Sequence, residues 1–138
     1  MKVFKFGGAS IESVERARNV ASIIVDYAEV KLLVVVSAKG KTTNALENVV
    51  HAFFTGDKRL ATQLFDELKQ EHKQYAHELM NGDTMGIYQT LDDLCTEVEW
   101  LLTEAPVRSY DYYYDQIVSV GELLSTAMIA AFLYKIVK

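Results

Sequence analysis

The run KLLVVV at residues 31–36 constrains the fold of this chain more than any other stretch. An unbroken apolar run rich in β-branched residues is typical of a strand that is covered on both faces, as in parallel sheets. A shorter strand is predicted for KVFKF at residues 2–6, and apolar residues recur with helical spacing over 14–28, between the two strands. The order strand, helix, strand predicts a right-handed βαβ unit and an α/β fold.

The middle of the chain is predicted to be helical, without a further strand. Apolar residues recur every three or four positions over 45–54, 61–79 and 87–102. Asn44 and Asp57 are the predicted N-caps of the first two of these helices, and Ser10 is the predicted N-cap of the helix behind the first strand. We expect the second and third helices to form a hairpin beside the sheet, and the tail from residue 110 to be mostly helical.

The predicted sheet is small, because two strands fall short of the roughly 4–6 that sheets usually contain. The tail also ends without a glycine, a proline or a polar cap. We therefore expect residues 1–138 to form the N-terminal part of a longer domain. On its own, such a part would expose a sheet edge or an apolar face.

The charge balance argues against a nucleic-acid-binding surface. The chain has 14 Lys and Arg residues against 19 Asp and Glu residues, a formal net charge of −5, whereas phosphate backbones are bound by clustered cations. No signal peptide is recognisable, and the apolar stretch TAMIAAFLYKIV is shorter than a membrane span. We expect a cytoplasmic protein without membrane association.

Neither a disulfide nor a metal site is predicted. Cys95 is the sole cysteine, and its helical spacing with apolar neighbours indicates a core residue. His72 and His77 are five positions apart, so they do not share a helix face as a metal-binding pair would.

The segment KFGGAS, at the end of the first strand, is suited to phosphate binding. Gly7 and Gly8 allow backbone N–H groups to approach a ligand closely. Lys5 adds a positive charge, and a helix beginning near Ser10 would add its positive end. Phosphoryl transfer requires such positioning and charge neutralisation. The alternative is an exposed lysine beside a turn that binds nothing.

Two further polar sites stand among apolar neighbours. SAKGKTTN follows the second strand, but it is not a P-loop, because Val35 occupies the place of the first glycine. Ser37 and Thr43 in this segment either donate to an anionic substrate or serve only the start of the next helix. Glu122, in SVGELLS, must either face solvent or meet a cation such as a substrate ammonium group.

KFGGAS near the start, VVSAKGKTTN after the second strand and SVGELLS near residue 120 occur in the order and at the spacing found in aspartokinases. The chain therefore resembles the N-terminal half of the catalytic domain of these enzymes, which belong to the amino acid kinase superfamily. The resemblance implies a three-layer αβα sandwich, here incomplete and carrying a helical hairpin insertion. It also implies phosphorylation of the L-aspartate side chain by Mg-ATP to 4-phospho-L-aspartate, the first step toward lysine, threonine and methionine.

The resemblance further implies roles for single residues. Lys5 would be the catalytic cation, and the phosphates would be held by Lys5, Gly7, Gly8 and Ser10. Aspartate would be bound by Ser37, Thr43 and Glu122, with Glu122 contacting its α-ammonium group. No protein ligand to a metal is implied, because Mg²⁺ would be held mainly through the phosphates of ATP.

The ATP-binding half and the regulatory ACT domains of such enzymes would lie beyond these 138 residues. We therefore expect the isolated chain to show no appreciable kinase activity, and the full-length enzyme to be a homo-oligomer. Two alternatives stay open: a sibling kinase acting on acetylglutamate, glutamate or carbamate, and a catalytically silent binding module. The joint presence of Lys5, Thr43 and Glu122 favours a kinase over a silent module.

Overall fold

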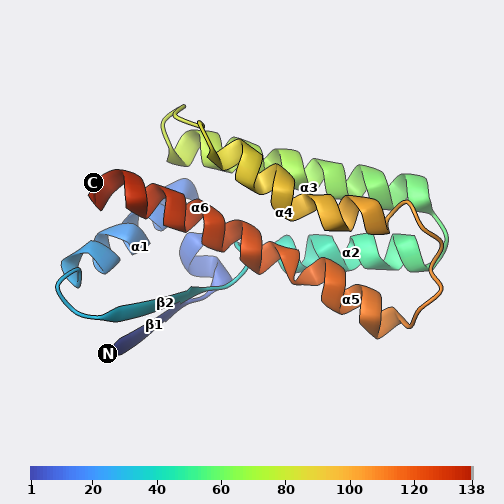
Figure 1. Cartoon of the computed structure of the whole chain (residues 1–138), viewed down its shortest axis with the longest axis horizontal. Coiled ribbons are helices and arrows are strands. Elements are labelled where there is room, and N and C mark those ends of the chain that lie inside the picture. Colours follow the sequence, from blue (N-terminus) through green and yellow to red (C-terminus); the bar gives the residue numbers. More distant parts are fainter. Residues whose placement is uncertain (138) are drawn as a thin grey trace.

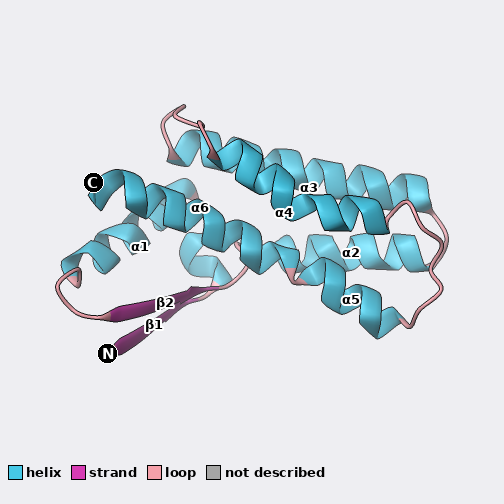
Figure 2. Cartoon of the chain, in the orientation of Figure 1, coloured by secondary structure: helices cyan, strands magenta, loops and turns pink. Residues whose placement is uncertain are grey.

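The computed structural model describes residues 1–137, in which two parallel strands and six α-helices form an elongated molecule (Figures 1 and 2). The strands are β1 (Lys2–Phe6) and β2 (Leu32–Val36), and a short 3-10 turn, η1 (Gly8–Ile11), follows β1. The helices are α1 (Val14–Asp26), α2 (Thr42–Phe54), α3 (Lys58–Leu79), α4 (Ile87–Leu101), α5 (Tyr110–Val118) and α6 (Val120–Val137). The predicted α/β class and the order strand, helix, strand are confirmed.

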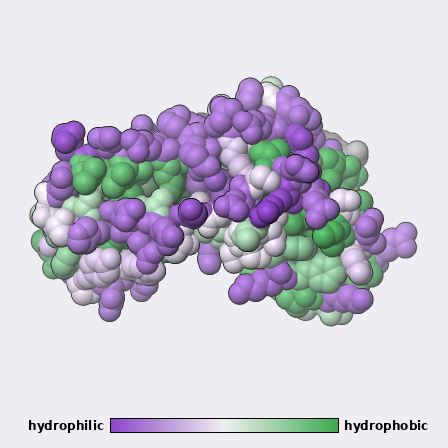
Figure 3. Space-filling model, turned by 180° about the vertical axis from the view of Figure 1, so that it is seen from behind, coloured by the Kyte–Doolittle hydropathy of each residue, from purple (hydrophilic) through white to green (hydrophobic). Residues whose placement is uncertain are grey.

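The sheet is covered on one face only within residues 1–137. β1 and β2 pair in parallel, with residues 2–6 opposite residues 32–36. Phe6 and Val34 pack against the core, whereas successive side chains on the other face remain exposed: Val3 (59%), Leu33 (51%) and Val35 (43%). The prediction that KLLVVV is covered on both faces is therefore wrong for the described chain, and the expected exposed apolar face is confirmed. Figure 3 shows hydrophobic side chains at the end of the molecule that carries the sheet and α1, and a second group at the opposite end.

The helices form a body that extends away from the sheet. Helices α2 and α5 lie at one end of the molecule and the sheet and α1 lie at the other, while α3, α4 and α6 run along the molecule between the two ends (Figure 1). α3 and α4 form the predicted hairpin, but it packs against α1, α2 and α6 instead of lying beside the sheet. The place against β2 is taken by α6, which is apolar around most of its circumference and needs burial on several sides.

One of the three predicted helix caps is confirmed. The Asp57 carboxylate accepts a hydrogen bond from the backbone N–H of Leu60 at 3.0 Å. Ser10 is not a cap, because the chain first makes the η1 turn and α1 begins only after Ser13, whose hydroxyl accepts from the Arg16 N–H. Asn44 is not a cap either, because α2 begins two residues earlier, at Thr42.

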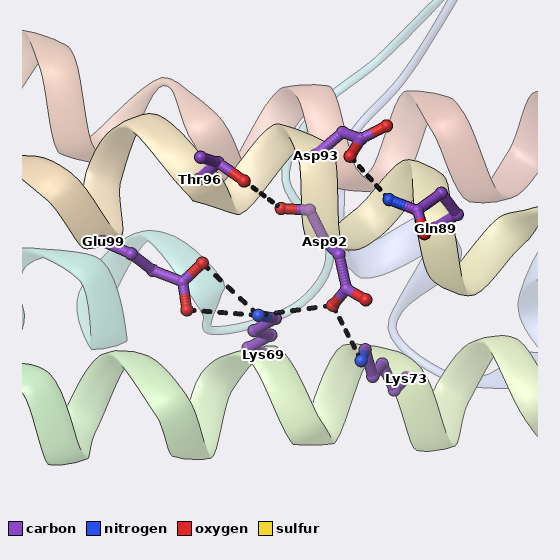
Figure 4. A network of polar contacts seen from close by, with 7 residues as sticks. All are labelled: Lys69, Lys73, Gln89, Asp92, Asp93, Thr96 and Glu99. Carbon is purple, nitrogen blue, oxygen red and sulfur yellow. Dashed lines mark hydrogen bonds and ion pairs between the residues drawn. The ribbon is translucent and has the colours of Figure 1, made fainter.

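The α3–α4 hairpin is held together by a network of ion pairs on its surface (Figure 4). Lys69 of α3 lies 3.3 Å from Asp92 and 3.1 Å from Glu99 of α4, and Lys73 lies 2.7 Å from Asp92. The hydrogen bond from Lys73 is the main reason that the pKa of Asp92 is lowered. Cys95 is buried in α4, and burial raises the pKa of its thiol to about 11, so the prediction of a core residue is confirmed.

The helical stretch Tyr110–Val137, which includes α5 and α6, is long and apolar enough to cross a membrane by length and composition alone. The apolar segment TAMIAAFLYKIV, which by itself is shorter than a membrane span, is only the last part of this longer helical stretch. Leu124, Met128 and Phe132 of α6 are buried in the core, as expected for the central helix of a packed domain.

Candidate functional site

Three segments that are far apart in the sequence meet at the carboxyl ends of the two strands. They are residues 7–11 after β1, residues 37–43 after β2 and residues 121–125 at the start of α6; we refer to them as the three site segments. The Gly40 N–H donates to the Gly8 carbonyl at 3.0 Å, which joins the first two segments. The Ser125 hydroxyl donates to the Ser37 carbonyl at 2.8 Å, which joins the second and third. The carboxyl ends of parallel strands are the usual place for ligands in α/β folds.

Gly8 is required by the fold itself. A Cβ atom at this position would lie 2.4 Å from the carbonyl oxygen of Ala38, closer than real Cβ atoms approach backbone. At Gly7, in contrast, a Cβ atom would meet no other atom within 4 Å. The two glycines that the sequence analysis treated alike therefore differ: Gly8 allows two site segments to touch, and Gly7 leaves open space.

Gly121 and Ser125 allow α6 to pack against the segment after β2. A Cβ atom at Gly121 would lie 3.0 Å from the side chains of Ala38 and Thr42, so the glycine permits this close packing. Ser125 is fully buried; its hydroxyl donates to the Ser37 carbonyl and also lies 3.0 Å from the carbonyl of Gly121. Sequence reasoning did not single out Ser125, although a polar residue one helical turn after Gly121 in an apolar helix is the signal that could have found it.

The predicted site residues belong to these segments or border them. Lys5 is the last residue but one of β1 and lies on the exposed face of the sheet, opposite Val35. Ser10 is exposed in η1, and Ser37 is half-buried directly after β2. Thr43 is exposed in the first turn of α2, and Glu122 is exposed in the first turn of α6; neighbouring Thr42 is buried instead.

None of the five predicted site side chains has a partner in the part of the chain that the structure describes. No hydrogen bond or ion pair within residues 1–137 engages the Lys5 ammonium, the Glu122 carboxylate or the hydroxyls of Ser10, Ser37 and Thr43. The site therefore presents one cation, one anion and three hydroxyls that are free to interact with a ligand. A zwitterionic substrate and an anionic phosphate group match this set in charge.

The family model of the amino acid kinase family matches residues 1–137. The chain belongs to this family. Aspartokinase 2, chloroplastic, of Arabidopsis thaliana is 35% identical over 144 residues, which cover 97% of the chain and 24% of that relative. The bifunctional aspartokinase/homoserine dehydrogenase 1, chloroplastic, of the same plant is 29% identical and is covered to 15% of its length. The chain thus spans about a quarter or less of the length of these relatives.

A solved structure supports the same relationship. Escherichia coli aspartokinase III in complex with aspartate and ADP matches with a TM-score of 0.69 and 26% sequence identity, over 97% of the chain and 29% of that structure. The resemblance to aspartokinases stated from three motifs is therefore confirmed, and so is the α/β fold of the amino acid kinase type.

The second site segment is tied to α3 by a charge cluster that no sequence motif indicated. Lys39 is buried, its Nζ contacts the Glu71 carboxylate, and the other oxygen of that carboxylate lies 3.2 Å from His72 Nδ1. Burial by itself would raise the pKa of Glu71, but the hydrogen bonds from His72 and Lys39 outweigh it and lower this pKa from 4.5 to about 2. No sequence pattern links residues 39 and 71.

The lowered pKa of Glu71 predicts a pH-dependent contribution to stability. Because the folded state favours the ionised carboxylate, this contribution is fully present above pH 4.5 and is lost as the pH falls toward about 2. We expect the difference in free energy of unfolding between wild type and Glu71→Gln, measured by urea unfolding, to be constant above pH 4.5 and to shrink below it. Glu67→Gln, one turn earlier on α3, is the control. A Glu71→Gln difference independent of pH would contradict the ion pair.

Proposed function

We propose that the three site segments form the aspartate-binding and phosphate-contacting part of an aspartate kinase active site. The observation that carries this proposal is that Lys5, Thr43 and Glu122 border one junction and lack partners within residues 1–137. The aspartokinase III structure that shares this fold is described as binding aspartate and ADP. The substrates of this chain are therefore proposed to be L-aspartate and ATP.

Each side chain has a role that follows from its charge. The Glu122 carboxylate accepts hydrogen bonds from the α-ammonium group of aspartate, and the hydroxyls of Thr43 and Ser37 donate to its carboxylates. An oxygen of the ionised side-chain carboxylate then bonds to the γ-phosphorus of ATP while the bond from that phosphorus to the β–γ bridging oxygen breaks, releasing ADP. The carboxylate attacks as an anion, so no proton has to be removed.

Lys5 is the proposed catalytic residue of this transfer. Its ammonium group neutralises negative charge on the phosphoryl group as it moves, and the open backbone at Gly7 admits the phosphates. Gly8 and Ser10 complete the proposed phosphate contacts. No three His, Cys, Asp or Glu side chains within residues 1–137 are grouped to hold a metal ion, so Mg²⁺ is proposed to be held by the phosphates of ATP.

Other properties of the protein are proposed from the sequence and its relatives. We expect a homo-oligomeric, cytoplasmic enzyme that binds neither nucleic acid nor membranes, and we expect residues 1–138 to lack appreciable activity in isolation. The location in particular needs a direct test, because the relatives reported above are described as chloroplastic.

L-aspartate binding by the chain tests the proposed function. In an NMR titration we expect the amide signals of Thr43 and Glu122 to shift on addition of L-aspartate. Glu122→Gln is expected to raise the Kd about tenfold or more, because a hydrogen bond to a charged group contributes about 1.5–3 kcal/mol.

Two controls make this titration specific. Glu29→Gln changes an exposed glutamate ahead of β2, at the other end of the sheet, and should leave the Kd unchanged. N-acetyl-L-glutamate lacks an ammonium group, so its Kd should be the same for wild type and Glu122→Gln. Equal Kd values for L-aspartate in wild type and Glu122→Gln would rule out the proposed role of Glu122, and tighter binding of N-acetyl-L-glutamate would favour a sibling kinase.

A further inference from the structure

We infer that Lys39, Glu71 and Tyr75 are positioning residues that hold the first two site segments at a fixed spacing from one face of α3. We refer to these three residues as the α3 brace. The inference rests on the proposed function, because the segments it positions are the proposed phosphate and aspartate sites.

Lys39 connects the second site segment to α3. The residue is only 6% exposed, its Nζ contacts Glu71, and the same atom lies 4.9 Å from the centre of the Tyr75 ring. A buried ammonium group is costly unless it is paired, so the side chain of Lys39 is confined to these two partners. Its own backbone carbonyl accepts from the Thr42 N–H, and the next residue, Gly40, donates to Gly8. The position of this segment is therefore coupled to α3.

Tyr75 connects the first site segment to the same face of α3. It lies four residues after Glu71, one helical turn along. Its hydroxyl donates to the carbonyl of Ile11 at 2.6 Å, and the carbonyl of Ser13 lies 3.3 Å away. Burial and the nearby charge of Glu71 raise the pKa of Tyr75, so the hydroxyl stays protonated as a donor. One turn of α3 thus contacts the chain after β1 and the chain after β2.

The Glu71 carboxylate is held in orientation from both sides. One oxygen contacts Lys39, and the other lies 3.2 Å from His72 Nδ1. The same Nδ1 lies 2.9 Å from the carbonyl of Leu68, so both neighbours of Nδ1 are acceptors and this nitrogen carries the proton. Since His72 is fully buried, it cannot swing away from Glu71 without leaving the core.

The ammonium group of Lys39, in the brace, has a different role from that of Lys5. The Lys39 ammonium is committed to Glu71 and Tyr75, whereas that of Lys5 has no partner within residues 1–137. The Lys39 side chain is buried but that of Glu71 is 55% exposed, so the ion pair adds little net stability, and the role we infer for it is orientation. An apolar residue at position 39 would fill the space without fixing the segment that carries Ser37 and Thr43.

The test uses two readouts on the chain: hydrogen exchange of the Gly40 amide, which donates to Gly8, and the Kd for L-aspartate. We expect the exchange rate of the Gly40 amide and the Kd for L-aspartate each to rise about tenfold in the single variants Lys39→Met, Glu71→Gln and Tyr75→Phe. The double variant Lys39→Met/Glu71→Gln should show no larger change than Lys39→Met alone, because the two residues act as one pair. The matched control is Lys69→Met, which removes two other ion pairs of α3, to Asp92 and Glu99 (Figure 4), neither of which touches a site segment. It should change thermal stability but neither readout.

The outcomes separate the brace from the proposed function. Unchanged Gly40 exchange in Lys39→Met and Glu71→Gln would overturn the inference, as would unchanged Kd values with wild-type binding intact. If the wild-type chain does not bind L-aspartate but the variants still accelerate Gly40 exchange selectively, the proposed function fails and the brace is supported as a structural coupling. Glu71→Gln preserves the size of the side chain, so it provides the test if Lys39→Met does not fold.

Discussion

Replacing Gly8 with alanine is expected to lower the free energy of unfolding by about 1–3 kcal/mol, the usual effect of overpacking a well-packed position. The added Cβ atom would lie 2.4 Å from the Ala38 carbonyl oxygen and 3.3 Å from the Gly40 nitrogen. Both atoms are backbone, so relief requires the chain after β2 to move away and the bond between Gly40 and Gly8 to lengthen. Urea unfolding of the variant measures the loss of stability.

Gly7→Ala is the matched control for this substitution. A Cβ atom at position 7 meets nothing within 4 Å, and the backbone φ of −74° suits alanine. We expect its unfolding midpoint to equal or slightly exceed that of wild type, because alanine lowers the conformational entropy of the unfolded chain. If Gly8→Ala were as stable as Gly7→Ala, the contact between the first two site segments would not exist as described.

Lys5→Ala is expected to lower aspartate-dependent turnover of the complete gene product by about 10²–10³-fold, the typical effect of removing one preorganised group that stabilises transition-state charge. The loss should appear in kcat, because the ammonium group acts on the moving phosphoryl group and not on aspartate. Turnover is measured as ADP release coupled to NADH oxidation, with and without L-aspartate.

The stability of the Lys5→Ala protein should be unchanged, since the side chain is exposed and unpaired within residues 1–137. Lys31→Ala, an exposed lysine just before β2, controls for the loss of one positive charge. Wild-type kcat in the Lys5→Ala enzyme would exclude Lys5 from catalysis. Turnover that is independent of aspartate in the wild type would instead count against the substrate.

Much of the fold was predictable because its signals are local. The apolar spacing along α3 and α4, the Asp57 cap and the burial of Cys95 depend on residues within a few turns of one another. The predictions that failed depend on neighbours distant in sequence. Ser10 does not cap α1, because the chain makes the η1 turn at Gly8, packed against Ala38, before α1 begins. The α3–α4 hairpin lies away from the sheet because α6 packs against β2.

The site, like the fold, was predictable where its signals are local in the sequence. KFGGAS and SAKGKTTN were identified by their chemistry at strand ends, and Glu122 stood out as a carboxylate in apolar company. The partners that hold these segments were not predictable from patterns. A lysine at 39 and a glutamate at 71 each resemble ordinary surface residues in the sequence, and only the packing of α3 shows that Lys39 is buried and paired.

The contacts that hold the site also determine when it can form. The bond from Lys39 to Glu71 spans 32 residues, that from Tyr75 to Ile11 spans 64, and that from Ser125 to Ser37 spans 88. Helices α3 and α4 need only local contacts, whereas closing such long loops is slow and comes after local structure. A chain emerging from the ribosome would therefore carry formed helices well before it carries a site, because the last contact waits for residue 125.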